Sequence, residues 1–257
     1  AEGGRDTQMN KTIFITGVTA GIGAATARKF VSQGWQAVGT GRRRDRLDAL
    51  AAELGDFFHP VMLDMRCPHD FGPALEALPE RYRGIVLLLN NAGLAPPMSV
   101  LQDAEQGPID VAIDTNITGL VALTRLLLPG LIERKGPVIN LSSVAATYPY
   151  RGGCVYAGTK AFVSQFSLGL RCDLHGTGVR VTSIEPGMVE TEFTIVRTGG
   201  DKAASDALYA GMDPMTADDM ADTIWCGATL TAHVNINTLE LMPTNQSWAG
   251  FAVHRTE

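Results

Sequence analysis

The chain has 257 residues, of which 45% are hydrophobic and 19% charged, and its formal net charge is −6. This composition supports a large buried core and argues against a disordered chain. The acidic balance argues against nucleic acid or an anionic membrane as a partner, because both are bound by basic surfaces. The longest apolar run, Ile85 to Leu89, is much shorter than the roughly 18 residues that span a bilayer.

The ends of the chain and its cysteines indicate where the protein works. Met9 is typical of a natural start, so residues 1–10 are expected to be a disordered tail whose first eight residues were added to the natural protein. This polar tail has no apolar stretch of the kind found in a signal peptide. The four cysteines are scattered and form no C-x-x-C pair, which argues against a disulfide framework or a zinc site. We therefore expect a cytoplasmic protein.

Short apolar strands alternate with helices along the chain. Strands are predicted at 12–15, 36–40, 60–63, 85–89, 138–141, 179–184 and 236–242, and helices at about 21–33, 45–54, from 68 onward, 109–134 and 155–174. Pro129 is expected to kink or split the fourth helix. This alternation predicts an α/β fold over residues 11–257, a single doubly wound parallel sheet of about seven strands with helices on both faces. The segment 190–214 interrupts the alternation and is expected to be a long loop that serves as a substrate lid.

A glycine-rich turn follows the first strand, in the spacing G-x-x-x-G-x-G from Gly17 to Gly23. Such a turn brings backbone close to a pyrophosphate at a helix N-terminus, although a turn without a ligand has the same appearance. At the end of the second strand, NAD-binding proteins usually carry a carboxylate for the ribose hydroxyl. Here Arg42 and Arg43 occupy that place, and two guanidinium groups suit a 2′-phosphate. The alternative is a pair of solvated surface arginines. The pattern favours NADP(H).

Several further motifs occur in a fixed order. N-N-A-G begins at Asn90, Asn116 lies in the following helix, Ser143 follows the fifth strand, Y-x-x-x-K spans Tyr156 and Lys160, and P-G begins at Pro186. With these motifs the chain resembles the short-chain dehydrogenase/reductase family over roughly residues 11 to 254. The resemblance is closest to NADP-dependent 3-hydroxy acid (serine, allo-threonine) dehydrogenases and sulfoacetaldehyde reductases. It implies a Rossmann-type fold, an oxidoreductase acting on CH–OH groups, and assembly as a homotetramer.

The resemblance also implies roles for individual residues. The expected catalytic residues are Asn116, Ser143, Tyr156 and Lys160. The expected cofactor-binding residues are Gly17, Thr19, Gly21, Ile22, Gly23, Arg42, Arg43, Asp64, Met65, Asn90, Ala92, Gly93, Tyr156, Lys160, Pro186, Gly187, Val189 and Thr191. Asp64 is expected to meet the adenine amino group, or else to be a carboxylate at a helix N-terminus.

Tyr156 and Lys160 stand four residues apart, which places both side chains on one face of a helix. A phenol has a pKa near 10, which is too high for a general base at neutral pH. Lowering it to about 7 requires roughly 4 kcal/mol of differential interaction, which the Lys160 ammonium and a positive nicotinamide are expected to supply. The resemblance implies that Lys160 also binds the nicotinamide ribose, that Ser143 holds the substrate oxygen, and that Asn116 positions Lys160 through a water.

Two arginines are candidates for substrate binding, Arg151 just before Tyr156 and Arg197 in the expected lid. Both could instead be surface residues. As pocket residues they would hold a small anion, and two cations suit a tetrahedral sulfonate better than a planar carboxylate. The preferred interpretation is reduction of sulfoacetaldehyde to isethionate, with a 3-hydroxy acid dehydrogenase acting on serine, allo-threonine or 3-hydroxypropionate as the alternative.

Other functions fit the sequence less well. A non-catalytic NADP(H) sensor would have no need of the four catalytic residues, and reduction of a bulky ketone would call for an apolar lid. The expected partners are therefore a small anionic aldehyde or hydroxy acid and further copies of the chain. The aromatic residues Trp248 and Phe251 suggest that the C-terminal tail packs against a neighbouring subunit.

Overall fold

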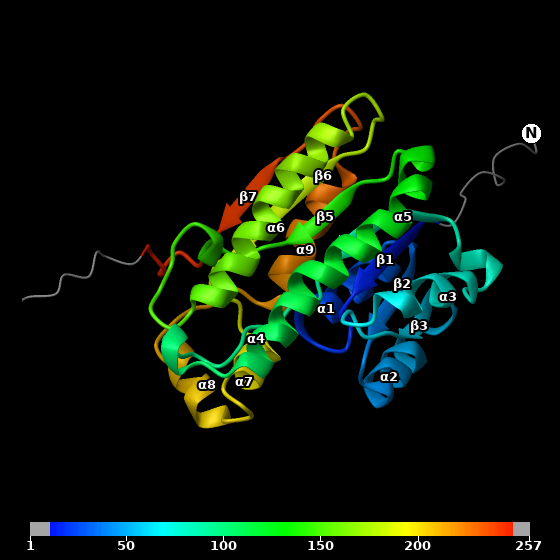
Figure 1. Cartoon of the computed structure of the whole chain (residues 1–257). Coiled ribbons are helices and arrows are strands. Elements are labelled where there is room, and N and C mark those ends of the chain that lie inside the picture. The colour runs from blue at the N-terminus through cyan, green and yellow to red at the C-terminus, as the bar shows by residue number, and fades with distance from the viewer. Residues whose placement is uncertain (1–10, 249–257) are drawn as a thin grey trace, which may run out of the picture.

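The structure, a computed structural model, describes residues 11–248. Its centre is one seven-stranded parallel sheet with the strand order β3-β2-β1-β4-β5-β6-β7 (Figure 1). The strands are β1 (Thr12–Thr16), β2 (Gln36–Gly41), β3 (Phe58–Met62), β4 (Ile85–Asn90), β5 (Val138–Leu141), β6 (Val181–Pro186) and β7 (Thr238–Leu241). The predicted doubly wound parallel sheet is confirmed.

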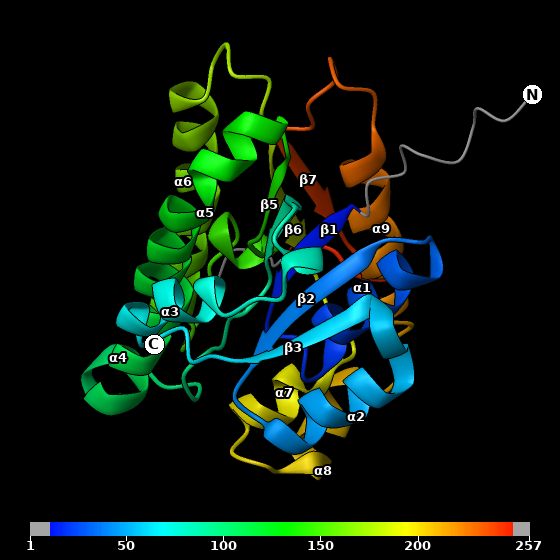
Figure 2. The ribbon, with the colours of Figure 1, turned by 90° about the vertical axis from the view of Figure 1, so that its right-hand side faces the viewer.

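Helices cover both faces of this sheet (Figure 2). They are α1 (Gly21–Ser32), α2 (Arg44–Leu54), α3 (Phe71–Glu76), α4 (Gln106–Ile113), α5 (Leu120–Arg134), α6 (Cys154–Asp173), α7 (Glu192–Arg197), α8 (Lys202–Tyr209) and α9 (Ala217–Thr229). Helices α1, α2 and α9 contribute to one core cluster, and α3, α5 and α6 contribute to another. Strand β1 serves both clusters, because Ile13 and Ile15 face the first and Phe14 faces the second. A strand buried on both faces is apolar throughout, which explains its uninterrupted apolar sequence.

The long helical stretch predicted at 109–134 extends over residues 106–134. It does not break at Pro129, which lies inside α5. Instead, a π-helical turn (Asp114–Gly119) joins α4 to α5. The stretch is long and apolar enough to cross a membrane by length and composition alone. Here Leu123, Leu127 and Leu131 of α5 are buried in the core against the sheet, as in a core helix.

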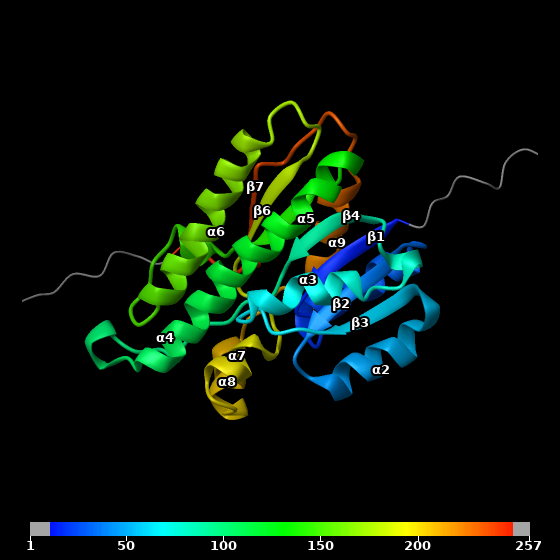
Figure 3. The same cartoon turned by 45° about the vertical axis from the view of Figure 1, so that its right-hand side comes forward.

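Two regions differ from the expectation. The segment 190–214 contains the short helices α7 and α8 rather than loop alone, and they lie beyond the carboxyl ends of the strands (Figure 3). Helix α9 was not predicted at all. It begins with a capping box in which Thr216 and Asp219 satisfy each other's backbone N–H groups, and it packs against α1. Its Met220 and Ile224 are buried, four residues apart on one face.

Candidate active site

A cavity of about 1160 Å³ lies at the carboxyl ends of the strands, around β1 and β4, where the strand order reverses. Open parallel sheets bind their ligands at this point. The volume exceeds the roughly 300–1,000 Å³ of ordinary small-molecule sites, so it accommodates a dinucleotide together with a small substrate. All of the predicted site residues line this cavity except Gly23, Asn90, Asn116 and Arg151.

The glycine turn is shaped to hold a phosphate group against backbone. Gly17 and Gly21 have φ angles of +75° and +53°, a conformation that side chains disfavour. At Gly23, a Cβ atom would overlap the carbonyl oxygen of Gly17, so the residue is required for close packing rather than for lining the cavity. Asn91 fixes the turn, because its Nδ2 donates to the carbonyl oxygens of Thr16 at 2.8 Å and Gly17 at 3.0 Å. These residues fit a dinucleotide.

The end of β2 brings the two predicted arginines to the same cavity but into different surroundings. The Arg42 side chain is 55% exposed, and its Nη1 lies 3.9 Å from a carboxylate oxygen of Asp64. Asp64 is held mainly by Arg66, which donates to it from both backbone and side chain. The hydrogen bond from the Arg66 side chain keeps the pKa of Asp64 low, so this carboxylate is ionised at neutral pH. Arg43 instead bonds to Thr19 and to Glu192 at the start of α7.

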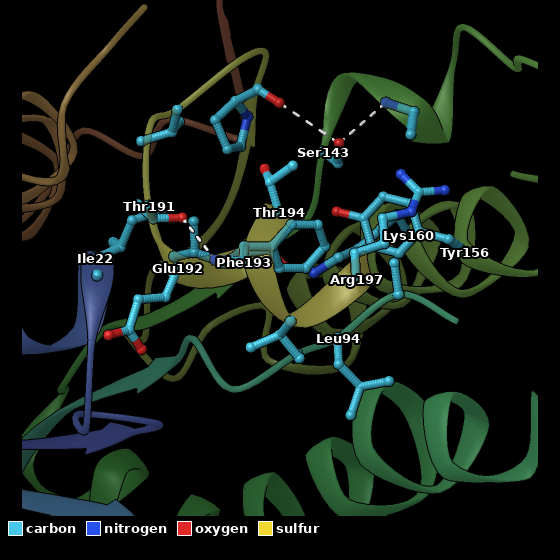
Figure 4. A pocket seen from close by; sticks show the side chains of 18 of the residues that line it. Ile22, Leu94, Ser143, Tyr156, Lys160, Thr191, Glu192, Phe193, Thr194 and Arg197 are labelled. Carbon is cyan, nitrogen blue, oxygen red and sulfur yellow. Dashed lines mark hydrogen bonds between the residues drawn. The ribbon is translucent and has the colours of Figure 1, made fainter. Parts of the chain in front are cut away.

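Ser143, Tyr156 and Lys160 converge on the other end of the cavity, and all three are largely buried (Figure 4). Ser143 follows β5, and Tyr156 and Lys160 lie in the first two turns of α6. The Lys160 Nζ donates to the backbone oxygen of Leu141 at 2.7 Å and lies 5.8 Å from the centre of the Tyr156 ring. A Cβ on Gly93 would be 3.3 Å from this Nζ, so the glycine leaves the ammonium reachable from the cavity.

Asn116 lies behind this group in the π-helical turn, and it is 1% exposed. Its amide exchanges two hydrogen bonds with the backbone of Leu94, and its Nδ2 also donates to Thr159 Oγ1 at 2.9 Å. Asn90 is similarly buried behind the cavity, and its Nδ2 donates to Thr124 and Asn140. Both asparagines therefore support the site from within the core.

The ionisation of the site in the protein alone is set mainly by burial. Burial raises the pKa of Tyr156 to about 12, although a hydrogen bond with Ser143 and the charge of Arg197 oppose the increase. Burial also lowers the pKa of Lys160 to about 8. Removal of the phenol from water outweighs the Ser143 hydrogen bond and the Arg197 charge, so the pKa of Tyr156 is raised; the lowering expected from Lys160 together with a bound nicotinamide stays a prediction. Tyr156 therefore holds its proton at neutral pH.

The two candidate substrate arginines lie in different places. Arg197, at the end of α7, lines the cavity and donates from Nη1 to the Tyr150 hydroxyl at 2.9 Å. Its guanidinium carbon lies 5.3 Å and 5.7 Å from the ring centres of Tyr150 and Tyr156, and its buried Nε has no hydrogen-bond partner among residues 11–248. Arg151 is exposed and does not line the cavity. The expectation that both arginines form the pocket wall was wrong for Arg151.

Sequence reasoning also missed several residues at this end of the cavity. Tyr150 accepts a hydrogen bond from Arg197, and Gln246 accepts a hydrogen bond from the Met188 backbone at 2.8 Å. No sequence motif indicated Gln246. Trp248 also lines the cavity, with its ring centre 5.6 Å from that of Tyr148. Phe251, the other residue of the expected tail contact, lies outside the described residues.

Comparison with known proteins agrees with this geometry. The model of the short chain dehydrogenase family matches residues 11–200. Serine 3-dehydrogenase of Agrobacterium fabrum is 60% identical over 252 residues, covering 96% of this chain and 99% of the relative. Sulfoacetaldehyde reductase 2 of Chromohalobacter salexigens is 51% identical over 251 residues, covering 96% and 100%.

A solved structure described as the closed form of serine dehydrogenase complexed with NADP+ matches with a TM-score of 0.94. It is 48% identical and covers 95% of this chain and 100% of its own. The cofactor in that relative is the one that Arg42 and Arg43 predicted from sequence. The family matches over far more than half of the chain, and its relatives match at full length. This chain belongs to the short chain dehydrogenase family.

Proposed function

We propose that this enzyme is an NADP(H)-dependent dehydrogenase of short 3-hydroxy acids, with serine as the best candidate substrate. The observation that carries the proposal is Arg197, a half-buried guanidinium beside Tyr156 whose Nε lacks a partner within the described chain. A three-carbon substrate has little apolar surface, so its affinity has to come largely from its charged end. One guanidinium binds a planar carboxylate through two parallel hydrogen bonds. The 60% identity to a serine 3-dehydrogenase supports the same substrate.

The residues of the site divide the chemistry of carbonyl reduction between them. Bound NADPH supplies the hydride. Tyr156, protonated at neutral pH, donates a proton to the substrate oxygen, and Ser143 holds that oxygen by a hydrogen bond. The Lys160 ammonium steadies the phenolate that remains and offers hydrogen bonds to the cofactor ribose. In alcohol oxidation, Tyr156 accepts the proton instead.

Cofactor selection is assigned to the end of β2. No carboxylate occupies the usual NAD position, and the exposed guanidinium of Arg42 faces the same cavity as the glycine turn. A 2′-phosphate carries negative charge that Asp or Glu would repel there and that an arginine attracts. The cofactor is NADP(H).

Sulfoacetaldehyde reduction is the second candidate, and the 51% identity to a sulfoacetaldehyde reductase supports it. The sequence argument for a sulfonate required two arginines around a tetrahedral anion. With Arg151 exposed and outside the cavity, that requirement is not met. A substrate with a carboxylate group is therefore preferred over one with a sulfonate group.

Oxidation rates with NADP+ distinguish these functions. L-serine, 3-hydroxypropionate, isethionate and the neutral 1,3-propanediol are compared by their kcat/KM values, followed by NADPH absorbance. We expect both carboxylates to exceed isethionate and the neutral diol to be the poorest. A preference for isethionate over both carboxylates would establish the sulfonate function, and a preference for the diol would reject an anionic substrate.

The homotetramer implied by the family resemblance stays a prediction.

A further inference from the structure

Helix α7 begins in an ion-pair cluster that joins it to the dinucleotide-binding turn. Glu192, its first residue, accepts hydrogen bonds from Arg46 Nη1 at 2.5 Å and from Arg43 Nη1 at 3.0 Å. Arg43 donates in turn to Thr19 Oγ1, from Nη2 at 2.9 Å and from Nε at 3.2 Å. The glycine turn, the end of β2 and the start of α7 are far apart in sequence, yet they meet at a single carboxylate.

These contacts connect two walls of the dinucleotide cavity. Thr19 and Arg43 line it from the side of β1 and β2, and Glu192 lines it from the side of α7. The walls also touch directly, because a Cβ on Gly21 would lie 3.2 Å from the Cβ of Thr191. In Figure 4, Thr191 lies close to the labelled Ile22 of the turn. The start of α7 is therefore fixed to the cofactor turn.

The charges of the cluster favour this arrangement at neutral pH. Burial raises the pKa of Glu192, but the hydrogen bonds from Arg46 and Arg43 outweigh it and hold the pKa below its ordinary value. The carboxylate is therefore ionised. The side chains of Glu192, Arg43 and Arg46 are 37%, 41% and 41% exposed, so each ion pair alone contributes modestly. Two arginines on one carboxylate form a small network, which contributes more than an isolated pair.

Because of these contacts, Arg42 and Arg43 differ in how many free N–H donors they can offer to a bound phosphate. All three nitrogen atoms of the Arg43 guanidinium already donate to Thr19 or Glu192. Arg42 is more exposed, and its nearest carboxylate, Asp64, is 3.9 Å away and already bound by Arg66. Arg42 thus has more donors to offer a phosphate, because three of the five N–H donors of Arg43 are used in the contacts with Thr19 and Glu192.

We propose that Glu192 is a positioning residue that, through Arg43 and Arg46, latches α7 to the dinucleotide-binding turn. The latch holds the cavity wall irrespective of the 2′-phosphate, so it slows the release of both dinucleotides. The rival arrangement is competition, in which Glu192 and the 2′-phosphate contend for Arg43. Competition predicts the opposite result, because removing the carboxylate would then strengthen NADPH binding alone.

The test compares Glu192→Gln with Glu190→Gln. Glu190 is exposed, and no ion pair or side-chain hydrogen bond of it occurs within residues 11–248, so it controls for loss of one charge near α7. Hydrogen exchange of residues 192–209 is measured without cofactor, and the dissociation rates of NADPH and NADH are measured by stopped-flow fluorescence. For Glu192→Gln we expect faster exchange and a similar, roughly three- to tenfold, increase in both dissociation rates. Glu190→Gln should behave as wild type.

Unchanged exchange in 192–209, or tighter binding of NADPH alone, would overturn the proposal. Arg46→Gln gives an independent test, because Arg46 does not line the cavity. Arg46→Gln should speed hydrogen exchange and both dissociation rates as Glu192→Gln does. The double variant Glu192→Gln/Arg46→Gln should show rates no faster than those of either single variant, as expected for residues that act through one contact. Fully additive effects of the two substitutions on the dissociation rates would refute the latch. Arg42→Ala should weaken NADPH binding and leave NADH binding unchanged, and equal losses would refute the assignment of Arg42.

Discussion

Replacing Arg197 with methionine separates recognition of the anion from the chemistry of the site. Methionine keeps an unbranched side chain between Tyr150 and Tyr156 but removes the charge. Loss of one partner of a buried charge pair costs about 2–5 kcal/mol. Because Arg197 is only half-buried and Tyr150 holds one of its nitrogens, we expect the lower part of this range, about 2–3 kcal/mol. This corresponds to roughly a 30- to 150-fold loss in kcat/KM for an anionic substrate.

The assay compares 3-hydroxypropionate with its neutral methyl ester in each enzyme. Arg197 also lowers the pKa of Tyr156, so its loss raises that pKa and slows oxidation of both substrates. The ratio of the two kcat/KM values cancels this shared effect and isolates recognition of the carboxylate. Arg151→Met removes the same charge from an exposed position and is expected to leave the ratio unchanged. An unchanged ratio in Arg197→Met would refute the assignment of Arg197 to the substrate.

Three further outcomes follow from the site. Tyr156→Phe removes the proton donor with little change in packing, so activity should fall by at least about 100-fold while the dissociation constant of NADPH, measured by fluorescence titration, stays near the wild-type value. Arg42→Asp should reverse the preference for NADPH over NADH in parallel titrations, with a loss for NADPH on the order of 2–4 kcal/mol. Because Tyr156 has a pKa of about 12 in the protein alone, kcat/KM for alcohol oxidation should rise with pH as the phenolate becomes more populated. Carbonyl reduction uses the protonated phenol and should stay flat from about pH 6 to 8, and a flat oxidation profile would contradict this assignment.

The sheet could be predicted from sequence because its strands are buried on both faces. The ends of elements were less predictable, as β6 shows. It was expected at 179–184 and runs from Val181 to Pro186, because Glu185 is buried inside it and accepts hydrogen bonds from Ser164 and Ser183. A glutamate in a strand gives no such signal in isolation. Helix α9 was missed although its capping box was readable from the sequence.

The placement of Tyr156 beside Lys160 could be predicted because their spacing along one helix puts both side chains on the same face. Spacing did not predict where the Arg151 side chain lies, although Arg151 stands only five residues before Tyr156. Gly152, with a φ of +78°, turns the chain between this arginine and α6, so closeness in sequence did not place the side chain in the cavity. The pKa of Tyr156 was also beyond sequence reasoning, because it depends on burial by residues from several separate segments.

The π-helical turn that carries Asn116 lies between α4 and α5. A regular α-helix advances by about 100° per residue, so the wide turn accommodates a residue that a regular helix would not. Deleting one residue between 114 and 119 would restore regular α-helical hydrogen bonding and keep α4 and α5 close to their present phase, but it would remove the wide turn that carries Asn116. Asn116 would then lose its contacts with Leu94 and Thr159. Such a shortened helix is expected to be more regular and the enzyme less active, so local helical regularity and function conflict at this turn.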